Sequence, residues 1–467
     1  MNNPTLIAER LSGIGALQAR VEGEVVVPGG DGWDEARQAW NLAVDQQPAA
    51  VAFPESVDDV AAIVRFAGAH GLQVTAQGTG HNAGPFAPPG SLGSVILVKT
   101  SRMRGVDIDP DARRARVDAG VLWAEVTDRA AEHGLAALAG SSPDVGVVGY
   151  SLGGGVSWLA RKHGFAANSV LAVEVVTADG RLVRAERENE HELFWALRGG
   201  GGAFGIVTAL EFELYPVADV YAGVMFWPLE RASEILHAWR EWIRTVPDDV
   251  TSIGRIMQFP PLPMVPEPFR GRSFALVEAA FVGDEAEGIE LVRPLRELGP
   301  ELDTFATIPA SALNKLHMDP EEPVPYLGDG MLLAELSAEA VDALVAAAGP
   351  GSGSSLLSVE VRHLGGAVAR RSPEHGALDA FDAEFALFAV GFAADAEMGA
   401  ATDARVQVVK TALSPWDAGQ EYLNSIERPS TGERLHGAET YRRLQAVKAQ
   451  YDPENRFRGN HPVSPAE

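Results

Sequence analysis

Glycine is concentrated at four places in the first half of the chain, at residues 78–84, 140–149, 153–155 and 199–205. Glycine permits positive φ angles and close approach to the backbone, and successive exposed N–H groups form concave nests that bind anions. One such cluster would indicate only a tight turn. Four clusters between predicted strands, in a chain with a formal net charge of −26, favour one extended ligand containing a diphosphate. The pattern therefore predicts a bound dinucleotide.

The first cluster, QGTGHNAG at residues 77–84, departs from the Rossmann fingerprint G-x-G-x-x-G. Its last glycine comes one residue too late. Pro85, Pro88 and Pro89 stand where the helix of that motif would begin, and proline there favours extended or turn structure. No glycine loop is followed by the Gly-Lys-Ser/Thr of a phosphate-binding P-loop. We expect the dinucleotide to be held without a Rossmann helix.

Local patterns divide the 467 residues into two domains and a C-terminal segment. Residues 1–216 mix strands and helices: a strand is predicted at residues 50–53, a helix capped by Ser56 and Gly71, and a hairpin turning at Asp179-Gly180. An N-terminal helix is also expected. Residues 217–415 alternate strands with Ala/Glu/Leu helices, which favours an antiparallel sheet covered by helices on one face. We predict an α+β fold in which residues 416–467 return to the first domain.

Composition excludes several classes of function. Lys and Arg number 38 against 64 Asp and Glu, without a basic block, so nucleic acid is not expected as a partner. No apolar run is long enough to span a membrane, and the first residues mix acidic and basic charges, so a cytoplasmic location is expected. The chain has no cysteine, which excludes disulfides, thiolate metal sites and thiol nucleophiles. No metal site is predicted.

Five sequence stretches, taken together, restrict the choice of protein family more than composition does. They are VVVPGGDGWDEARQAWN with PAAVAFPESVDDVAAIVRFA, then QGTGHNAG, then GSSPDVGVVGYSLGGGVSWLARKHGFAANSVLAVEVVTADG, then ELFWALRGGGGAFGIVT, and finally YLNSIERP with LQAVKAQYDPENRFRGNHPVSP. With them the chain resembles the berberine-bridge-enzyme-like FAD-linked oxidoreductases of the vanillyl-alcohol-oxidase / p-cresol-methylhydroxylase (PCMH) superfamily. The resemblance covers roughly residues 24–215 and 420–465.

The resemblance implies a PCMH-type FAD-binding fold of two small α+β subdomains, with a core at about residues 46–216, followed by a substrate domain. It implies an FAD whose ADP part is buried by the first domain and whose ring lies at the border with the second. The histidine of the family's G-x-G-H loop, His81 here, would bond covalently to the 8α-methyl group of the flavin. Many relatives add a bond from a Cys-Pro pair, but this chain has Ser142-Pro143 there. A single covalent link is therefore predicted.

Further cofactor contacts follow from the same resemblance. On the pyrophosphate side they are Gly78, Thr79, Gly80, Asn82 and Gly84. Near the ribityl chain and the ring they are Ser141, Ser142, Val145, Gly146, Gly149, Tyr150, Gly153 and Gly154. Ile206 and Val207 would contact the flavin through their backbone, and Asn424 and Asn460 would come from the C-terminal segment.

The reaction implied is hydride transfer to flavin N5 from an alcohol- or amine-bearing carbon of a carbohydrate or secondary metabolite, while a base removes the proton. Relatives often have a tyrosine after the Asn of Y-x-N as that base, whereas this chain has Ser425. The remaining candidates are Tyr150 and three residues of SVEVRHLGG. Strand alternation puts Glu360 and Arg362 on one face and His363 on the other. A salt bridge is the alternative role for Glu360 and Arg362.

Three questions stay open at this point. The electron acceptor is O2 or another compound, and Val147 and Val148, where relatives often have glycine, would restrict access of O2. An NADPH-dependent reductase on the same fold is disfavoured, because such enzymes generally lack the histidine link. A flavin-binding protein with little turnover is a further alternative, and the oligomeric state is undetermined.

Overall fold

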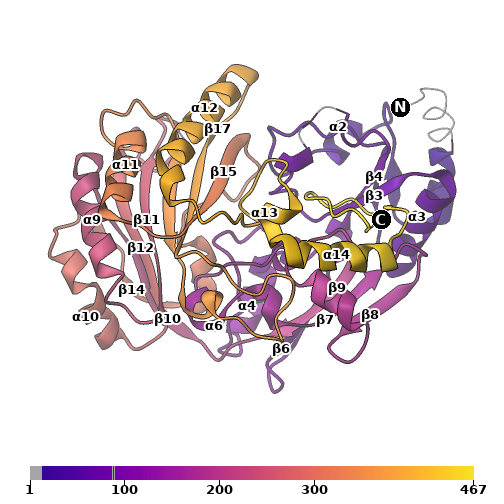
Figure 1. Cartoon of the computed structure of the whole chain (residues 1–467), viewed down its shortest axis with the longest axis horizontal. Helices are drawn as coiled ribbons and strands as arrows, with labels where there is room; N and C mark the ends of the chain where they lie inside the picture. The colour runs from indigo at the N-terminus through magenta and orange to yellow at the C-terminus, as the bar shows by residue number, and fades with distance from the viewer. Residues whose placement is uncertain (1–12, 87, 89, 264, 467) are drawn as a thin grey trace.

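Three β-sheets organise the chain in this computed structural model, which describes residues 13–86, 88, 90–263 and 265–466. Figure 1 shows the two smaller sheets in the right half of the molecule and the large sheet in the left half. Sheets and helices are mixed in both halves. The predicted α+β class is confirmed.

The N-terminal sheet has the strand order β1-β2-β4-β3, with β2 and β3 parallel to β4. Its strands are β1 (Glu24–Val26), β2 (Ala50–Phe53), β3 (Gln73–Gln77) and β4 (Val95–Lys99). Helix α3 (Val57–His70) has the predicted caps: the Ser56 hydroxyl accepts a hydrogen bond from the Asp59 N–H, and Gly71 ends the helix with φ of 65°. Strand β3 leads directly into the loop at residue 78, which is followed by a short 3-10 helix, Gly84–Phe86, and by no Rossmann helix among the described residues.

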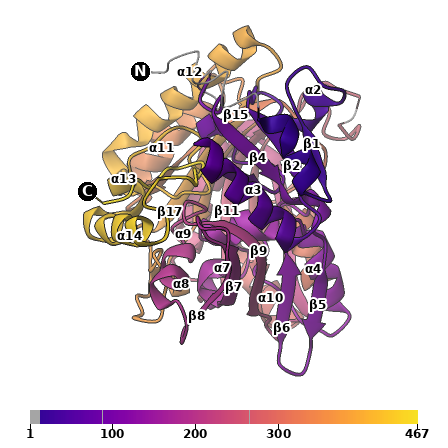
Figure 2. The same cartoon turned by 90° about the vertical axis from the view of Figure 1, so that its right-hand side faces the viewer.

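The second sheet is antiparallel, with the order β5-β6-β9-β7-β8. Its strands are β5 (Val106–Asp109), β6 (Arg114–Asp118), β7 (Val170–Val176), β8 (Leu182–Glu186) and β9 (Ile206–Glu213). The β7–β8 hairpin turns at Asp179-Gly180 as predicted, with Gly180 at φ of 77°. Alternate side chains such as Val117, Val173 and Leu210 pack into one core with helices α4 (Trp123–Ala131), α5 (Val147–Leu152) and α8 (His191–Leu197). Helix α3 contacts β7 and β9 and so lies between the two small sheets (Figure 2).

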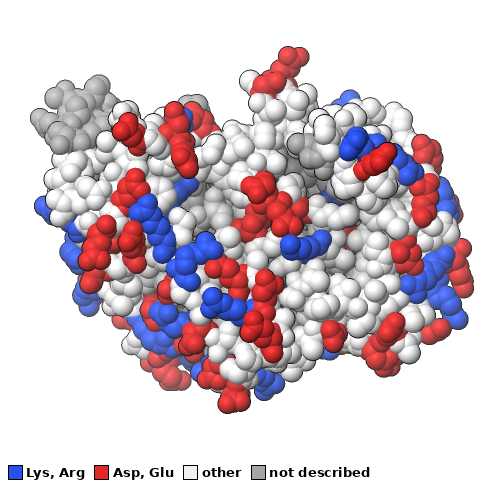
Figure 3. All heavy atoms as spheres, turned by 180° about the vertical axis from the view of Figure 1, so that it is seen from behind, with Lys and Arg blue, Asp and Glu red and all other residues white. Residues whose placement is uncertain are grey.

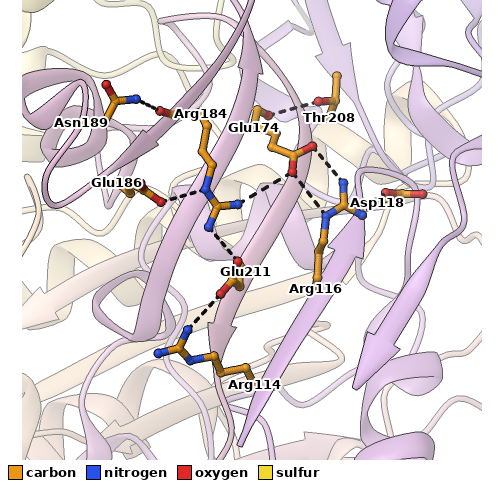
Figure 4. Close-up of polar contacts among 9 residues, drawn as sticks. All are labelled: Arg114, Arg116, Asp118, Glu174, Arg184, Glu186, Asn189, Thr208 and Glu211. Atoms are coloured by element: carbon orange, nitrogen blue, oxygen red, sulfur yellow. Dashed lines mark hydrogen bonds and ion pairs between the residues drawn. The ribbon is translucent and has the colours of Figure 1, made fainter. Parts of the chain in front are cut away.

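The other face of this second sheet carries a network of ion pairs (Figure 4). The Arg184 guanidinium binds Glu186 at 2.7 Å and Glu211 at 2.8 Å, and Arg116 binds Glu174 at 2.8 Å. Exposed pairs of this kind contribute about 0–1 kcal/mol each. Their main significance is that they mark the solvent side of the sheet.

The large sheet has the order β13-β10-β12-β11-β16-β17-β15, and β14 also pairs with β10. Its strands are β10 (Asp219–Pro228), β11 (Val250–Gln258), β12 (Ser273–Phe281), β13 (Leu302–Asp303), β14 (Ala306–Pro309), β15 (Tyr326–Leu333), β16 (Ser358–His363) and β17 (Phe385–Phe392). Four helices cover one face: α9 (Ala232–Trp242), α10 (Glu285–Arg296), α11 (Ala338–Ala348) and α12 (Ala396–Leu413). Trp239, Leu344 and Val409 from these helices share a core with Ile256 and Leu387 of the sheet. The predicted antiparallel sheet with helices on one face is confirmed.

The C-terminal segment, yellow in Figures 1 and 2, lies against the two small sheets. Helix α13 (Gly432–His436) precedes α14 (Ala438–Tyr451), which packs against α8, and Phe457 forms a parallel bridge with Val74 of β3. Short helices α2 (Trp33–Ala36), α6 (Ala160–His163) and α7 (Ala166–Ser169) complete the set. The predicted N-terminal helix lies largely outside the described residues, which begin with 3-10 turns at Ile14–Ala16 and Gln18–Arg20. The domain limits at 216 and 415 stay a prediction.

Acidic and basic side chains are interspersed on the face shown in Figure 3, with no broad blue area. Among the described residues, no helix combines the length and the apolar character needed to cross a bilayer.

Candidate functional site

A cavity of about 430 Å³ lies between the glycine loops and the helix-free face of the large sheet. Fourteen of the predicted cofactor residues line it: Gly78, Thr79, Gly80, His81, Asn82, Ser141, Ser142, Val145, Gly146, Gly149, Tyr150, Val207, Asn424 and Asn460. Of the predicted catalytic residues, Tyr150, Glu360 and Arg362 line it. The fold thus brings together segments that lie far apart in the sequence.

The glycine wall leaves space for a group lying flat against the backbone. A Cβ added at Gly149 or Gly202 would meet no heavy atom within 4 Å, and at Gly78 the nearest atom would be Thr100 Oγ1 at 4.0 Å. Gly80 has φ of 89°, a conformation that side chains rarely adopt. This wall is therefore shaped for close backbone contact with a ligand, as an FAD site requires.

His81 is held from several directions at one end of the cavity. Its ring stacks on Trp40, with centroids 4.2 Å apart, and its Nδ1 lies 2.7 Å from Thr79 Oγ1. Nε2 lies 3.5 Å from Asp144 Oδ1, and neither buried atom has a hydrogen-bond partner among the described residues. The Tyr326 hydroxyl donates to the backbone carbonyl of His81 at 2.7 Å. The imidazole is thus oriented by Trp40 and Thr79, while Nε2 has no hydrogen-bond partner among the described residues and lies beside the Asp144 carboxylate.

Five predicted site residues do not line the cavity. Four of them are Gly84, Gly153, Gly154 and Ile206, and the fifth is His363. A Cβ at Gly84 would lie 2.3 Å from the Glu427 carbonyl oxygen, and one at Gly153 would lie 1.8 Å from Asn424 Oδ1. The Cβ of a residue replacing Gly154 would meet Leu378, and Ile206 belongs to the core beneath the N-terminal sheet. These glycines allow the C-terminal segment to pack closely on the loops.

The two predicted asparagines connect the C-terminal segment to the cavity wall. Asn424 Nδ2 donates to the Tyr150 carbonyl at 2.9 Å, and the Asn460 side chain contacts the Asn82 carbonyl at 3.4 Å. Asn82 in turn donates to the Leu423 carbonyl at 3.0 Å, while its Oδ1 is buried without a partner. Their amide groups therefore fix the loops on which the cavity depends.

Tyr150 lies in helix α5 with its hydroxyl buried and without a hydrogen-bond partner among the described atoms. Burial raises its pKa well above the ordinary value, so the phenol stays protonated. Residues 149–153, GYSLG, also match the letters of the G-x-S-x-G nucleophile elbow of hydrolases. Ser151, however, is buried inside α5 and does not lie at a strand-to-helix turn.

Glu360 and Arg362 face the cavity from β16, as strand alternation predicts, and His363 points away. Arg362 lies 3.4 Å from Glu360 Oε1 and over the Trp158 ring at 5.7 Å. His363 contacts Arg161 at 3.0 Å and stacks on Phe385, and burial followed by the charge of Arg161 lowers its pKa to about 3. It is a packed neutral histidine outside the site.

Sequence reasoning missed a group of charged residues on the same wall. Arg255 of β11, His317 and Asp319 line the cavity, and Glu278 of β12 lies directly behind them. Both Ser141 and Ser142 donate hydrogen bonds to Asp319 Oδ2, at 3.0 and 2.7 Å. No motif marks these residues, because two strands and one loop bring them together.

Comparisons with known proteins agree with this geometry. Residues 48–186 match the family model described as FAD binding domain, and residues 420–464 match the model described as Berberine and berberine like. The chain is 28% identical over 472 residues, 96% of its length and 98% of the relative's, to (R)-6-hydroxynicotine oxidase of Paenarthrobacter nicotinovorans. It is 33% identical over 248 residues to glucooligosaccharide oxidase of Sarocladium strictum, covering 52% of this chain and 49% of the relative.

Solved structures share this fold over at least 96% of the chain. A structure of 6-hydroxy-D-nicotine oxidase from Arthrobacter nicotinovorans has a TM-score of 0.82 at 27% identity, over 96% of this chain and 98% of that one. Physcomitrella patens BBE-like 1 has a TM-score of 0.85 at 21% identity, over 97% and 99% of the two chains.

Proposed function

Because the chain belongs to the berberine-bridge-enzyme-like FAD-linked oxidoreductases, and is thus an FAD-dependent enzyme acting on a small molecule, we propose that it oxidises a hydroxyl- or amine-bearing carbon. One observation carries this: a single cavity joins a glycine wall suited to a flavin with a charged wall that contains a carboxylate. Bound FAD would supply the hydride acceptor. The chain's own residues would hold the cofactor and accept the substrate proton.

On the glycine side, the backbone around Gly78, Gly80, Gly146 and Gly149 would hold the cofactor. Arg458 also lines this cavity near Asn460, and its guanidinium suits an anionic diphosphate. His81 would form the single covalent bond to the flavin. The unpartnered Nε2, the stacking on Trp40 and the lack of cysteine support this assignment.

On the sheet side, Glu360 would accept the proton that leaves the substrate as the carbon is oxidised. Burial by itself raises the pKa of Glu360, but His317 and Arg362 outweigh it and hold the pKa well below its usual range. Glu360 therefore faces the cavity as a carboxylate. Tyr150, protonated and without a described partner, would donate a hydrogen bond to a bound oxygen.

The test is an anaerobic screen of flavin reduction. Purified protein carrying FAD is mixed with sugars, alcohols and amine alkaloids, including a gluco-oligosaccharide and 6-hydroxynicotine. Bleaching of the flavin by one class, lost in Glu360→Gln, supports the proposal. Bleaching by NADPH alone would point to the reductase, and no bleaching by any compound to a flavin-binding protein without turnover.

The electron acceptor is O2 or another compound, and measuring H2O2 release during aerobic turnover distinguishes the two. The cytoplasmic location expected from the sequence stays a prediction, which cell fractionation would examine.

A further inference from the structure

Three ionisable side chains form a continuous chain of contacts behind and beside the cavity. His317 Nδ1 lies 2.5 Å from Glu278 Oε2, and His317 Nε2 lies 2.6 Å from Glu360 Oε2. The exposed fractions of Glu278, His317 and Glu360 are 0%, 4% and 8%. Both imidazole nitrogens therefore face carboxylates where water is largely excluded.

The number of available protons limits the protonation states that Glu278, His317 and Glu360 can adopt together. A carboxylate only accepts hydrogen bonds, and a neutral imidazole donates from one nitrogen only. The two contacts therefore need a second proton: either His317 is an imidazolium between two carboxylates, or it is neutral and one glutamate is protonated. The Arg255 guanidinium donates to Glu278 Oε1 at 3.0 Å, so both oxygens of Glu278 are in contact with nitrogen groups of other residues. The second proton is thus shared between His317 and Glu360.

We propose that His317 is a positioning residue that shares a proton with Glu360 and thereby holds the Glu360 carboxylate in the cavity as the acceptor of the substrate proton. This rests on the proposed function. In the step concerned, bound FAD would take up the hydrogen of the substrate C–H bond as a hydride, together with its two electrons. The O–H or N–H proton passes to Glu360, and the C=O or C=N bond forms.

The charges around His317 come from every element packed against it. Glu278 belongs to β12, Arg255 to β11, and Glu360 and Arg362 to β16. Asp319 lies 3.9 Å from Nε2 on the segment that carries His317, and Trp158 packs edge-on at 6.3 Å. Burial and Arg255 lower the pKa of His317, but Glu278, Glu360 and Asp319 outweigh them and raise it to about 9.

Backbone strain at the same place supports a functional arrangement. Met318, between His317 and Asp319, has φ of 59°, a left-handed conformation that non-glycine residues rarely adopt. Such strain persists only where surrounding contacts fix it. Here those contacts are the two glutamates on His317 and the hydroxyls of Ser141 and Ser142 on Asp319.

The experiment is a pH titration by NMR of the flavin-loaded protein labelled with ¹³C in its histidine rings. We expect one resonance with an apparent pKa of about 9, which is missing in His317→Asn. Glu278→Gln and Glu360→Gln each move it toward the ordinary value, and the matched control Glu174→Gln on the outer sheet leaves it in place. The proposal is overturned if the apparent pKa of His317 lies near or below the ordinary histidine value. It is also overturned if that pKa is the same in the wild type, Glu278→Gln and Glu360→Gln.

This titration needs no substrate, so a failed substrate screen and a failed proton-sharing model are distinguishable. With a compound from the screen that reduces the flavin, His317→Asn is expected to slow reduction on the order of 100-fold and to change its pH profile near pH 9. His317→Gln serves as a second variant, and thermal unfolding confirms that both fold. An unchanged pH profile in both variants would overturn the role assigned to His317.

Discussion

At the scale of single residues, His81 combines a fixed ring with an unpartnered nitrogen. We expect His81→Ala to abolish covalent flavin, because no cysteine is present to form another link. Mass spectrometry of the denatured chain would show the flavin adduct in the wild type and its loss in the variant. His191→Ala, which removes an exposed histidine, keeps the adduct. Flavin released by acid precipitation of the wild-type protein would contradict the covalent link.

A second prediction at the scale of single residues concerns the pH dependence of stability that arises from Glu427. Burial raises its pKa to about 8, the contact of its Oε1 with the Tyr326 hydroxyl at 2.8 Å opposes the shift, and Asp329 adds to it. Because the pKa in the folded state exceeds that in the unfolded state, the contribution of Glu427 to stability is greatest below the ordinary value of 4.5 and falls as pH rises toward about 8.

Glu427→Gln should remove this fall. Urea unfolding at several pH values between about 5 and 8 would show a flatter stability profile for Glu427→Gln than for the wild type. Glu397→Gln, at an exposed position in α12, provides the control and should follow the wild type. Parallel profiles for Glu427→Gln and the wild type would refute the expectation.

At the scale of elements, Lys448 fixes helix α14 to the glycine loop at 199–205. Its ammonium group is fully buried, binds Asp452 at 2.5 Å, and donates to the carbonyls of Ala203 at 2.6 Å and Phe457 at 2.7 Å. Removing one partner of a buried ion pair leaves an uncompensated charge and costs about 3–5 kcal/mol. We expect Lys448→Met to lower the free energy of unfolding by about that amount.

Chemical denaturation measures this effect. Arg187→Met removes an exposed ion pair with Glu374 and is the matched control, which should unfold near the wild-type midpoint. Equal midpoints for Lys448→Met and Arg187→Met would show that α14 does not depend on the buried lysine.

Element-scale predictions from sequence succeeded where the signal is local. The caps of α3 and the hairpin at Asp179-Gly180 depend on neighbouring residues, so they could be predicted.

At the scale of the whole molecule, the proposed flavin site lies in the cavity between the glycine loops and the large sheet. Val148 lines this cavity, whereas its neighbour Val147 is fully buried in the core. We expect slow reoxidation of the reduced protein by O2, and Val148→Gly to speed it about tenfold, ~1.4 kcal/mol in the barrier. Stopped-flow mixing with O2 measures both rates. Val147→Ala is the control, and an oxidase-like rate in the wild type would exclude the restriction.

The glycine loops of the cavity could be predicted from the sequence, whereas most of its charged residues could not. The sequence by itself determined the glycine wall and His81, because backbone freedom and a reactive side chain are local properties that a motif records. It also determined that Glu360 and Arg362 share a face and His363 lies opposite, since side chains alternate along a strand.

Only the tertiary structure decided which face of β16 lines the cavity and which residues join Glu360 there. Arg255, Glu278 and His317 come from separate strands and a loop, and pairing across the large sheet sets their distances. In the sequence these residues look like ordinary charged residues, and their role in the site can be recognised only when the fold buries them next to one another. The structure also shows that Gly84, Gly153 and Gly154 do not line the cavity and that a Cβ there would collide with Glu427, Asn424 and Leu378, while their flavin contacts stay a prediction.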